Sequence, residues 1–366
     1  MLERPINLMA SVSPTGYGVT GYHIGEELNN LGWEIALFAK GPTERAEPHE
    51  QSLVNTWLKK ADEFNYAKNV PTLNIWHQHD LASHVGKGPY FAWPIFELDT
   101  FTKKEECHMQ VPDHLIVCSQ WAKDMLVKNL VRHPSLIHVC PLGVGDYINW
   151  PYSTKSENTV FLNAGKWEIR KGHDILTEIF NKAFKPKDKV ELHLCPHNFF
   201  LSAQEQKNWA SQYKDTPMGD HVTIHPWQKE HKHLIRIMSG ADCGIFPSRA
   251  EGWNLELLEM LSLGKHVITT NYSAHTEFCN SKNALLVDIT EVEPAYDGQW
   301  FFEQGNWAKI GEDQIDQFVE HMRAIHRLKQ EGILEENREG IITGQTYTWE
   351  NSAKKLEKIL ELEVDT

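Results

Sequence analysis

Long apolar runs, paired cysteines and positive charge are all scarce in this chain of 366 residues. No stretch approaches the ~20 consecutive apolar residues that a membrane-spanning helix needs. The 6 cysteines show neither a Cys-x-x-Cys pair nor a pairing rhythm, so reduced core thiols are expected rather than a disulfide framework. Acidic residues outnumber basic ones by 50 to 36, and the net charge of −14 argues against a protein that grips nucleic acid over a broad surface.

The composition is sufficient for ordinary globular domains. Apolar residues make up 41% of the chain, and its length accommodates two domains of usual size. The first residues, Met-Leu-Glu-Arg-Pro, lead into a predicted strand rather than into the apolar segment of a signal peptide. We therefore expect a cytoplasmic protein with most of its 13 tryptophans in cores or domain contacts.

Strand-like and helix-like patterns alternate in the first 145 residues. Strands are predicted over residues 6–12, 33–39, 73–76, 90–96, 114–118 and 136–141. Helices are predicted over about 20–31 and 49–60, and a further helix is predicted to begin after Ser119 as its N-cap. A segment rich in turn formers, from Pro141 to Pro151, is predicted to be a linker.

The same alternation starts again after this linker. Strands are predicted over residues 159–164, 189–195, 221–225, 242–246 and 265–269, and helices over 172–184, 230–239 and 254–263. Such alternation is typical of parallel, doubly wound sheets, so the chain is predicted to hold two successive α/β domains. An amphipathic pattern from Tyr347 to Leu362 predicts one more helix.

Residues 248–264 are the most informative stretch of the chain. They pass through Glu251 and Gly252 in the turn between a predicted strand and a predicted helix. Unpaired backbone N–H groups and the helix dipole favour an anionic ligand at such a turn. Glu259 lies roughly 7 to 8 Å further along the helix axis if the helix begins near Asn254. A phosphate at the helix tip with a carboxylate to each side matches the order of hexose, diphosphate and ribose in a nucleotide sugar.

A second motif, Gly-Lys-Trp-Glu-Ile-Arg-Lys-Gly-His, occupies residues 165–173 after the first predicted strand of the second domain. A departing nucleoside diphosphate gains negative charge on its β-phosphate, and fixed cations stabilise that charge in the transition state. Lys166 and Lys171 are therefore candidates for contact with the diphosphate. A solvated basic loop is the alternative interpretation.

The two motifs together resemble the signature of the family-4 retaining glycosyltransferases of GT-B fold. Glu251 and Glu259 have the spacing of that family, with seven residues between them, in the context Pro-Ser-x-x-Glu-Gly. The other motif in the family usually reads Gly-Arg-(apolar)-x-x-x-Lys-Gly, so Lys171 matches its lysine and Lys166 stands at the arginine position. A lysine there keeps the charge but loses the bidentate fork of arginine. The resemblance extends over most of the chain and is specific across about residues 160–290.

The resemblance implies a GT-B fold with two facing Rossmann-like domains. Residues 1–145 are expected to form the acceptor-side domain and residues 146–345 the donor-binding domain. Residues 346–366 are expected to form a helix that packs back on the first domain. The implied activity is that of a retaining, metal-independent hexosyltransferase without a cofactor. It would move a sugar from a nucleoside-diphosphate sugar to a hydroxyl acceptor, which is a glycan, a lipid-linked molecule or a small molecule.

The resemblance also implies roles for individual side chains. Glu259 would contact the ribose hydroxyls, Lys171 and Lys166 the diphosphate, and Glu251 the hexose hydroxyls. The candidate donor-binding residues are Gly16, Gly18, Lys166, Lys171, Trp227, Ser248, Glu251, Gly252, Trp253, Asn254, Leu255 and Glu259. In similar enzymes the departing phosphate helps to deprotonate the acceptor, which is why no carboxylate nucleophile is expected.

Two of these donor candidates, Trp227 and Asn254, and the neighbouring Glu256 admit structural interpretations as well. Trp227 is predicted to stack on the base, although a core or rim tryptophan is equally compatible with its position. Asn254 replaces a glycine common in the family motif, and Glu256 replaces a frequent proline. Both replacements either retune the sugar pocket or merely cap and begin the helix.

The first domain contains a Gly-x-Gly-x-x-Gly pattern at residues 16–21, after a strand and before a helix. A dinucleotide site would require an acidic residue at the end of the second strand, and Lys40 lies there instead. We therefore expect a glycine-rich loop close to the donor phosphate or the acceptor, with Tyr17 on the acceptor side. A plain tight turn is the alternative.

Histidines at one strand end provide further acceptor-side candidates. His77 and His79 alternate along a strand and so face the same side, but no third and fourth ligand show matching spacing, and no metal site is expected. Many relatives have a functional histidine at the tip of the following strand. Glu97 occupies that region here and joins Glu251, Lys171 and Lys166 as a candidate catalytic residue, with the role of contacting the transferred sugar or orienting the acceptor. A surface carboxylate is the alternative.

Rival functions remain open on sequence alone. They are a GT-B enzyme of another type, such as a phosphorylase or a sugar-nucleotide epimerase, a glycosyltransferase acting on modified DNA bases, and a non-catalytic sugar- or nucleotide-binding protein. The acidic charge disfavours DNA, and no nucleic-acid partner is expected. Lys123, Lys128 and Arg132 give one predicted helix a basic edge, which allows at most weak membrane-surface contact and is better explained as a solvated face.

Overall fold

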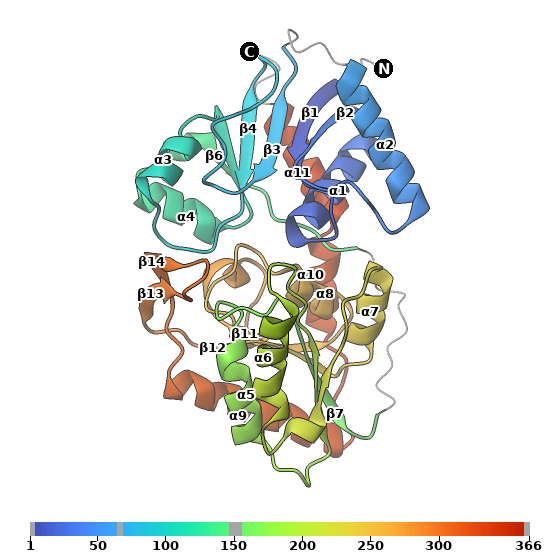
Figure 1. Cartoon of the computed structure of the whole chain (residues 1–366), viewed down its shortest axis with the longest axis vertical. Coiled ribbons are helices and arrows are strands. Elements are labelled where there is room, and N and C mark those ends of the chain that lie inside the picture. Colours follow the sequence, from blue (N-terminus) through green and yellow to red (C-terminus); the bar gives the residue numbers. More distant parts are fainter. Residues whose placement is uncertain (1–3, 64–68, 146–155, 362–366) are drawn as a thin grey trace. The chain divides into compact units, whose positions relative to one another are not determined.

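The computed structural model describes residues 4–63, 69–145 and 156–361, shown in Figure 1. The chain divides into two compact units. Unit 1 contains Met1–Gly145 and Tyr347–Thr366, and unit 2 contains Asp146–Thr346. The linker expected around Trp150 and Pro151 lies outside the described residues.

Unit 1 is built on a parallel sheet with the strand order β2-β1-β3-β4-β5-β6. Its strands are β1 (Arg4–Ala10), β2 (Trp33–Ala39), β3 (Thr72–Trp76), β4 (Tyr90–Pro94), β5 (His114–Val117) and β6 (Ile137–Val139). The connections contain α1 (Gly16–Asn30), α2 (Pro48–Glu63), α3 (Lys103–Met109), α4 (Gln120–Lys128) and the 3₁₀ turn η1 (Pro134–Leu136). Parallel strands need helical crossovers that cover both faces, and accordingly every residue of β4 is buried.

The last helix, α11 (Trp349–Glu361), belongs to unit 1, where it packs against α1 (Figure 1). Its apolar face is buried along its length, from Trp349 to Leu360. Arg4 of the first strand donates to the carboxylate of Glu357 at 2.6 Å. Gly143 lies so close that a side chain there would meet the backbone nitrogen of Trp349 at 2.1 Å. The helix therefore completes the core of unit 1 from the far end of the sequence.

Unit 2 repeats the architecture with the strand order β12-β11-β10-β7-β8-β9, again parallel. Its strands are β7 (Thr159–Ala164), β8 (Val190–Cys195), β9 (Val222–Ile224), β10 (Cys243–Phe246), β11 (His266–Thr270) and β12 (Leu285–Val287). Its helices are α5 (His173–Ala183), α6 (Ala203–Lys214), α7 (His231–Ser239), α8 (Leu255–Ser262), α9 (Glu312–Gln330) and α10 (Arg338–Thr346), with the 3₁₀ turns η2 (Gly219–His221) and η3 (Ser273–Glu277). Helices α5 and α9 pack on one another and on the strands to form the main core of the unit.

The order of strands in unit 2 reverses direction at one point. The chain runs outward from β7 through β8 to β9, and then returns to the other side of β7 to run from β10 to β12. The direction of the strand order therefore reverses between the adjacent strands β7 and β10. Open α/β sheets bind their ligands at such a point.

An additional antiparallel hairpin follows β12. Its strands are β13 (Val292–Tyr296) and β14 (Phe302–Ala308), joined around Asp297–Phe301. The hairpin was not predicted from the sequence, and neither were α3, α6, β12, α9 and α10. Most of these segments are short and carry little periodicity, whereas α9 has 19 residues with one buried face, so its pattern was present in the sequence and was missed.

The predicted alternation is confirmed in both units. Strand β7 has the predicted bounds, and most other predicted strands differ by one or two residues at their ends. The prediction for residues 16–20 was wrong, because α1 begins at Gly16 and not at about Thr20. The glycine-rich segment is the first turn of a helix rather than a loop.

The composition predicted reduced cysteines and no membrane-spanning helix. All six cysteines are free thiols, and Cys118, Cys140, Cys243 and Cys279 are buried, whereas Cys107 is exposed. No helix within residues 4–63, 69–145 and 156–361 combines the length and apolar character that a membrane span requires.

Candidate functional site

The two sequence motifs of unit 2 meet at the amino end of α8. Lys171 Nζ lies 2.8 Å from Glu251 Oε1, and Arg170 Nη1 lies 2.8 Å from Glu251 Oε2. The hydroxyl of Ser248 donates to the same carboxylate at 2.8 Å. Residues 80 or more positions apart are thus brought together, because β7 and β10 are neighbours in the sheet.

A second carboxylate extends this arrangement. Glu168 accepts from Arg170 Nη2 at 2.9 Å and lies 2.8 Å from Lys166 Nζ. The five side chains of Lys166, Glu168, Arg170, Glu251 and Lys171, hereafter the donor cluster, therefore alternate in sign. The Lys171 side chain is 10% exposed and that of Lys166 is 43% exposed, so only Lys166 lies at the solvent-facing end.

The donor cluster is charged throughout. Burial by itself raises the pKa of Glu251, but the charges of Lys171 and Arg170 outweigh burial and hold the pKa well below its usual range. The same opposition lowers the pKa of Glu168, with Arg170 and Lys166 as the cations. Burial lowers the pKa of Lys171, yet Glu251 and Glu256 raise it above its ordinary value. Buried charges of this kind are costly to desolvate and are concentrated at functional sites.

Gly172 explains why a glycine follows Lys171. It is the N-cap of α5 with φ of +78°, the left-handed region that glycine occupies at no steric cost. A side chain there would also meet the carbonyl oxygen of Pro247 at 2.1 Å. The glycine therefore lets the loop after β7 lie against the loop after β10, which brings the two motifs into contact.

Asn254 has a structural role that the sequence left open. It is the N-cap of α8 with φ of +86°, and its side chain accepts from the backbone of Leu257 at 3.2 Å. Asparagine tolerates the left-handed region better than most residues do, which explains how it replaces a glycine. Its amide nitrogen also lies 3.0 Å from His275 Nε2. The interpretation of Asn254 as a helix cap is therefore confirmed.

The other candidates in this turn lie beside the donor cluster. Trp253 is buried, and its ring packs against Phe278 with centroids 4.8 Å apart. Gly252 is buried in the same turn, and Leu255 is the first residue of α8. The backbone N–H of Glu251 donates to Ser273 Oγ at 2.9 Å, so this amide already has an acceptor.

Two buried histidines support the site and were not identified from the sequence. His173 Nε2 lies 2.9 Å from the carbonyl oxygen of Gly165, and His275 Nδ1 lies 2.9 Å from Thr269 Oγ1. Burial lowers the pKa of each to about 4, so both are neutral at pH 7. His173 belongs to a motif that was recognised, whereas no spacing or pattern pointed to His275.

Glu259 lies on α8 one turn beyond the tip. Its side chain is 6% exposed, and its Oε1 lies 2.7 Å from Nε2 of His231, the first residue of α7. Its Oε2 is buried and has no hydrogen-bond partner among the residues that the structure describes. The carboxylate thus has one oxygen held by protein and one oxygen left for a ligand. His231 was missed because nothing in its sequence context links it to Glu259.

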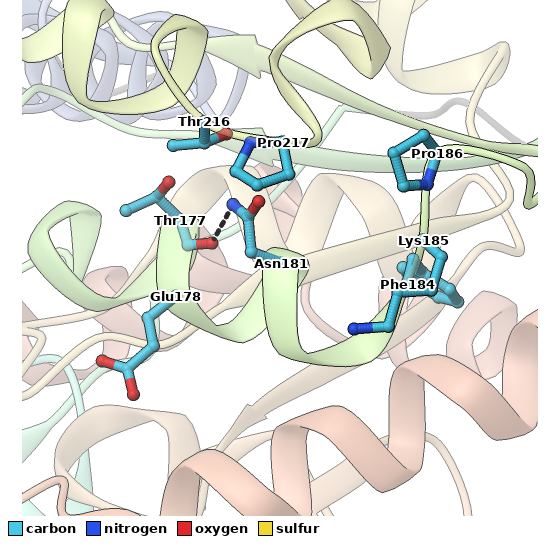
Figure 2. A pocket seen from close by; sticks show the side chains of 8 residues that line it. All are labelled: Thr177, Glu178, Asn181, Phe184, Lys185, Pro186, Thr216 and Pro217. Atoms are coloured by element: carbon cyan, nitrogen blue, oxygen red, sulfur yellow. Dashed lines mark hydrogen bonds between the residues drawn. The ribbon is translucent and has the colours of Figure 1, made fainter.

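In the described part of unit 2, crevices lie at both ends of the sheet. A crevice of about 350 Å³ is bordered by Trp227, His197 and Trp167 at the carboxyl ends of β7, β8 and β9. The crevice in Figure 2 is lined by residues of α5 and by segments that lead into β8 and β9, such as Lys185 and Thr216. It therefore lies toward the amino ends of the strands, away from the donor cluster.

The acceptor-side candidates lie in unit 1. The hydroxyl of Tyr17 donates to the carbonyl oxygen of Ile95 at 2.6 Å and lies 3.2 Å from His77 Nδ1. The rings of His77 and His79 stack with centroids 5.2 Å apart. The structure thus brings Tyr17, His77 and His79 together. Glu97 is half-buried and follows β4, two residues beyond Ile95.

The two glycines predicted to contact the donor also lie in unit 1, unlike the other donor candidates. Gly16 is the first residue of α1. Gly18 lies so close to Ser13 that a side chain there would meet a carbonyl oxygen at 1.9 Å. Packing against residue 13 accounts for Gly18 without any ligand.

Other clusters were considered for metal or surface binding. Within the described parts of the chain, no three His, Cys, Asp or Glu side chains are grouped as a metal site. In the basic edge near α4, Lys123 donates to the carbonyl of Ile137, and Arg132 donates to those of Gln110 and Pro112. These two cations therefore stabilise the fold of unit 1 rather than forming a free basic face.

Comparison with solved structures identifies the fold. Sucrose-phosphate synthase from Thermosynechococcus elongatus superposes with a TM-score of 0.69 at 15% identity, covering 98% of this chain and 99% of that chain. A glycosyltransferase from Rickettsia africae superposes with a TM-score of 0.69 at 13% identity, covering 100% of this chain and 99% of that chain. HepE from Anabaena, in complex with UDP and glucose, superposes with a TM-score of 0.66 at 15% identity, covering 98% of this chain and 100% of that chain. The predicted GT-B fold of two Rossmann-like domains is confirmed.

Sequence comparison identifies the family. No curated protein sequence gives a significant match. A family model described as glycosyl transferases group 1 matches residues 148–332, which is just over half of the chain and includes the whole donor cluster. The chain therefore belongs to the group 1 glycosyl transferases.

Proposed function

We propose that the protein is a retaining, metal-independent glycosyltransferase that moves a hexose from a nucleoside-diphosphate sugar to a hydroxyl acceptor. The observation that carries this proposal is the buried contact of Lys171 and Arg170 with Glu251 at the amino end of α8. A desolvated cation next to a helix N-terminus is a site for a phosphate.

The diphosphate is assigned to Lys171, Lys166 and the turn before α8. When the bond between the anomeric carbon and the β-phosphate oxygen breaks, the electron pair remains on that oxygen. The Lys171 ammonium and the backbone N–H groups of Gly252 and Trp253 stabilise the new charge. These groups are fixed before the reaction and need no reorganisation, so they stabilise the transition state more than the bound donor.

Glu251 is assigned to the hexose hydroxyls. Because its pKa is held well below the usual range, it is ionised at neutral pH and accepts hydrogen bonds only. It is therefore suited to orient hydroxyl groups and not to act as a general acid. In a retaining transfer the acceptor oxygen attacks the anomeric carbon from the face of the departing diphosphate. The acceptor proton then passes to the phosphate oxygen, which balances the reaction without a protein nucleophile.

The nucleoside is assigned to the remaining part of the ligand side of unit 2. Glu259 Oε2, buried and without a protein partner in the described chain, would accept from the ribose hydroxyls. The crevice next to Trp227 would take the base. HepE, a protein of the same fold, has been solved with UDP and glucose, so uridine donors are the first to test.

Direct assay of donor turnover tests the proposal. The full chain is incubated with UDP-glucose, GDP-mannose or ADP-glucose in the presence of EDTA, and release of the nucleoside diphosphate is measured. Lys171→Met should lower release by about 10² to 10³, the usual effect of losing one donor to a developing oxyanion. Lys182→Met, at an exposed ion pair of α5, is the matched control and should leave the rate unchanged.

The same reactions separate the proposal from its rivals. The anomeric configuration of a transferred sugar, read by NMR, reports on retention. Equal rates for Lys171→Met and the wild type would contradict the assignment of the diphosphate site. A strict requirement for a divalent cation would contradict metal independence.

A further inference from the structure

Exposed aromatic side chains are concentrated on one part of unit 2. In the described chain, the strongly exposed aromatic residues are Phe199, Phe200, Trp227, Tyr296, Trp300 and Phe302. They come from the loop after β8, the loop after β9 and the β13–β14 hairpin. Several large rings in contact with water forgo the stabilisation that burial would give them, and such patches mark binding surfaces.

The hairpin crosses the ligand side of the sheet. The hairpin follows β12, which lies at one edge of the sheet. The ring of Trp300 nevertheless lies 5.4 Å from the ring of Phe200, which follows β8. Strands β11, β10 and β7 lie between these two strands in the sheet. The hairpin therefore spans the region in which the donor cluster lies.

Contacts through Phe200 and Arg249 link the hairpin to the donor cluster. The ammonium of Lys166 lies 5.5 Å from the centre of the Phe200 ring. At the base of the hairpin, the backbone of Ala308 donates to the carbonyl of Arg249 at 2.9 Å, two residues before Glu251. The exposed rings are thus continuous with the proposed donor site.

The tip of the hairpin is preorganised. One carboxylate oxygen of Asp297 accepts from the backbone N–H groups of Gln299, Trp300 and Phe301, at 2.7 to 2.9 Å. Buried Trp307 fixes the base, and its Nε1 donates to Glu293 at 3.2 Å. A lone two-stranded hairpin is marginally stable, so these contacts hold the exposed rings in place. Little ordering entropy is then lost when a ligand binds.

The composition of the hairpin indicates what it binds. Residues 291–308 include Glu291, Glu293, Asp297 and Glu303 and no lysine or arginine. Glu291 and Glu293 lie 2.7 and 3.7 Å from Lys309 and Arg249, and the remaining negative charge disfavours phosphates, nucleic acid and anionic lipid headgroups. Aromatic faces with carboxylates and amides around them suit a neutral, hydroxyl-rich ring, whose C–H face packs on the aromatic ring while its hydroxyls donate to the carboxylates.

We propose that Phe200, Trp300, Tyr296 and Phe302, the aromatic platform, bind neutral sugar rings of an acceptor glycan beside the transfer site. Tyr296 and Phe302 are directly opposed in the hairpin, which puts them on the same face. The identification of the bound sugar as the acceptor rests on the proposed function. The platform would make unit 2 contribute to acceptor binding, in addition to the acceptor-side residues expected in unit 1.

Binding to a panel of immobilised neutral oligosaccharides tests the aromatic platform. The full chain should bind some members of the panel, and Trp300→Ala and Phe200→Ala should each weaken that binding by tenfold or more. Ile342→Ala, at an exposed apolar residue of α10 far along the chain, is the matched control and should bind as the wild type does. Because the replaced rings are exposed, the melting temperature should change little in all three variants.

Two further measurements assign the source of any loss. The shift in melting temperature with UDP-glucose reports on the donor, and sedimentation with vesicles of phosphatidylcholine and phosphatidylglycerol reports on a membrane surface. If Trp300→Ala has the same UDP-glucose shift and the same vesicle sedimentation as the wild type, the assignment of the aromatic platform to glycan binding is supported. Failure of the wild type to bind any neutral oligosaccharide, loss of the UDP-glucose shift alone, or loss of vesicle binding alone would each overturn it. Glycan binding needs no turnover, so it stands even if Lys171→Met shows that the proposed transfer is wrong.

Discussion

Single residues at and near the amino end of α8 each have more than one role. Asn254 adopts a left-handed conformation, caps the helix and contacts His275, all with one short polar side chain. Glu259, one turn further on, is held by His231 through one oxygen only. The stability of the turn and the placement of the proposed ribose contact therefore depend on a few hydrogen bonds that can be removed one at a time.

Replacement of Asn254 separates the cap from the backbone conformation. Asn254→Ala loses the cap and puts in the left-handed region a residue that tolerates it less well than asparagine, so the free energy of unfolding should fall by about 2–3 kcal/mol. Asn254→Gly relieves the backbone and keeps acceptable capping, so its loss should be under about 1 kcal/mol. Urea unfolding measures both, and a glycine variant less stable than the alanine variant would contradict the explanation.

Replacement of His231 tests whether it positions Glu259. His231→Ala should weaken UDP binding by about 5- to 10-fold, the cost of roughly 1 kcal/mol for one hydrogen bond, while kcat at saturating donor stays near the wild-type value. His231→Gln should restore part of the affinity. His233→Ala, at an exposed neighbour on the same helix, is the control, and an equal effect there would show that His231 has no special role.

Individual elements join parts of the chain that are distant in sequence. Helix α11 supplies core residues to unit 1 from the end of the chain. Cys140 contacts the helix through Ser352, and Val144 pairs with Thr348, which directly precedes the helix. The β13–β14 hairpin in turn joins the far edge of the sheet of unit 2 to the loop after β8. Each element contributes to the fold through its contacts with segments that are distant in sequence.

Truncation of one α11 side chain tests its place in unit 1. Leu356 is fully buried, so Leu356→Ala should lower the stability of unit 1 by about 2–4 kcal/mol. Amide hydrogen exchange should show faster opening of β1 and β2 with β10 and β11 unchanged. Equal acceleration in the two sheets would mean that the helix does not belong to the core of unit 1 alone.

At the scale of the whole molecule, the two units differ in how protons affect them. Unit 2 contains two fully buried neutral histidines, His173 and His275, next to a network of buried charges. In each, burial lowers the pKa from the ordinary value of 6.5 to about 4. The unfolded chain therefore takes up protons below about pH 6.5 that the folded unit takes up only near pH 4.

The stability of unit 2 should accordingly fall as the pH falls from 7 to 5. A histidine that stays neutral in the fold contributes stability that is present above pH 6.5 and is lost toward pH 4, by about 2 kcal/mol each between pH 7 and 5. Hydrogen exchange of β10 and β11 at several pH values measures the slope. His173→Gln should remove about half of it, whereas His233→Gln, at an exposed residue, should not change it.

Much of the fold and part of the site were predictable because they depend on short stretches. Strand β7 has the predicted bounds, Ser119 caps α4 as predicted, and the spacing of Glu251 and Glu259 is a property of one turn and one helix. The hairpin escaped prediction because its aromatic residues carry no clean alternation. His231 escaped prediction because its partner lies on another helix.

The sequence by itself determined two α/β units and the residue types of the proposed phosphate site, since periodicity, glycine turns and helix caps act over a few neighbouring residues. Only the tertiary structure decided that Arg170 and Lys171 bind Glu251, that His231 holds Glu259, and that Trp300 reaches Phe200. These contacts depend on which strands are neighbours in the sheet and on how far each loop extends across it. Hydrophobic burial and the crossover rules of the whole unit set that order, and no local pattern encodes it.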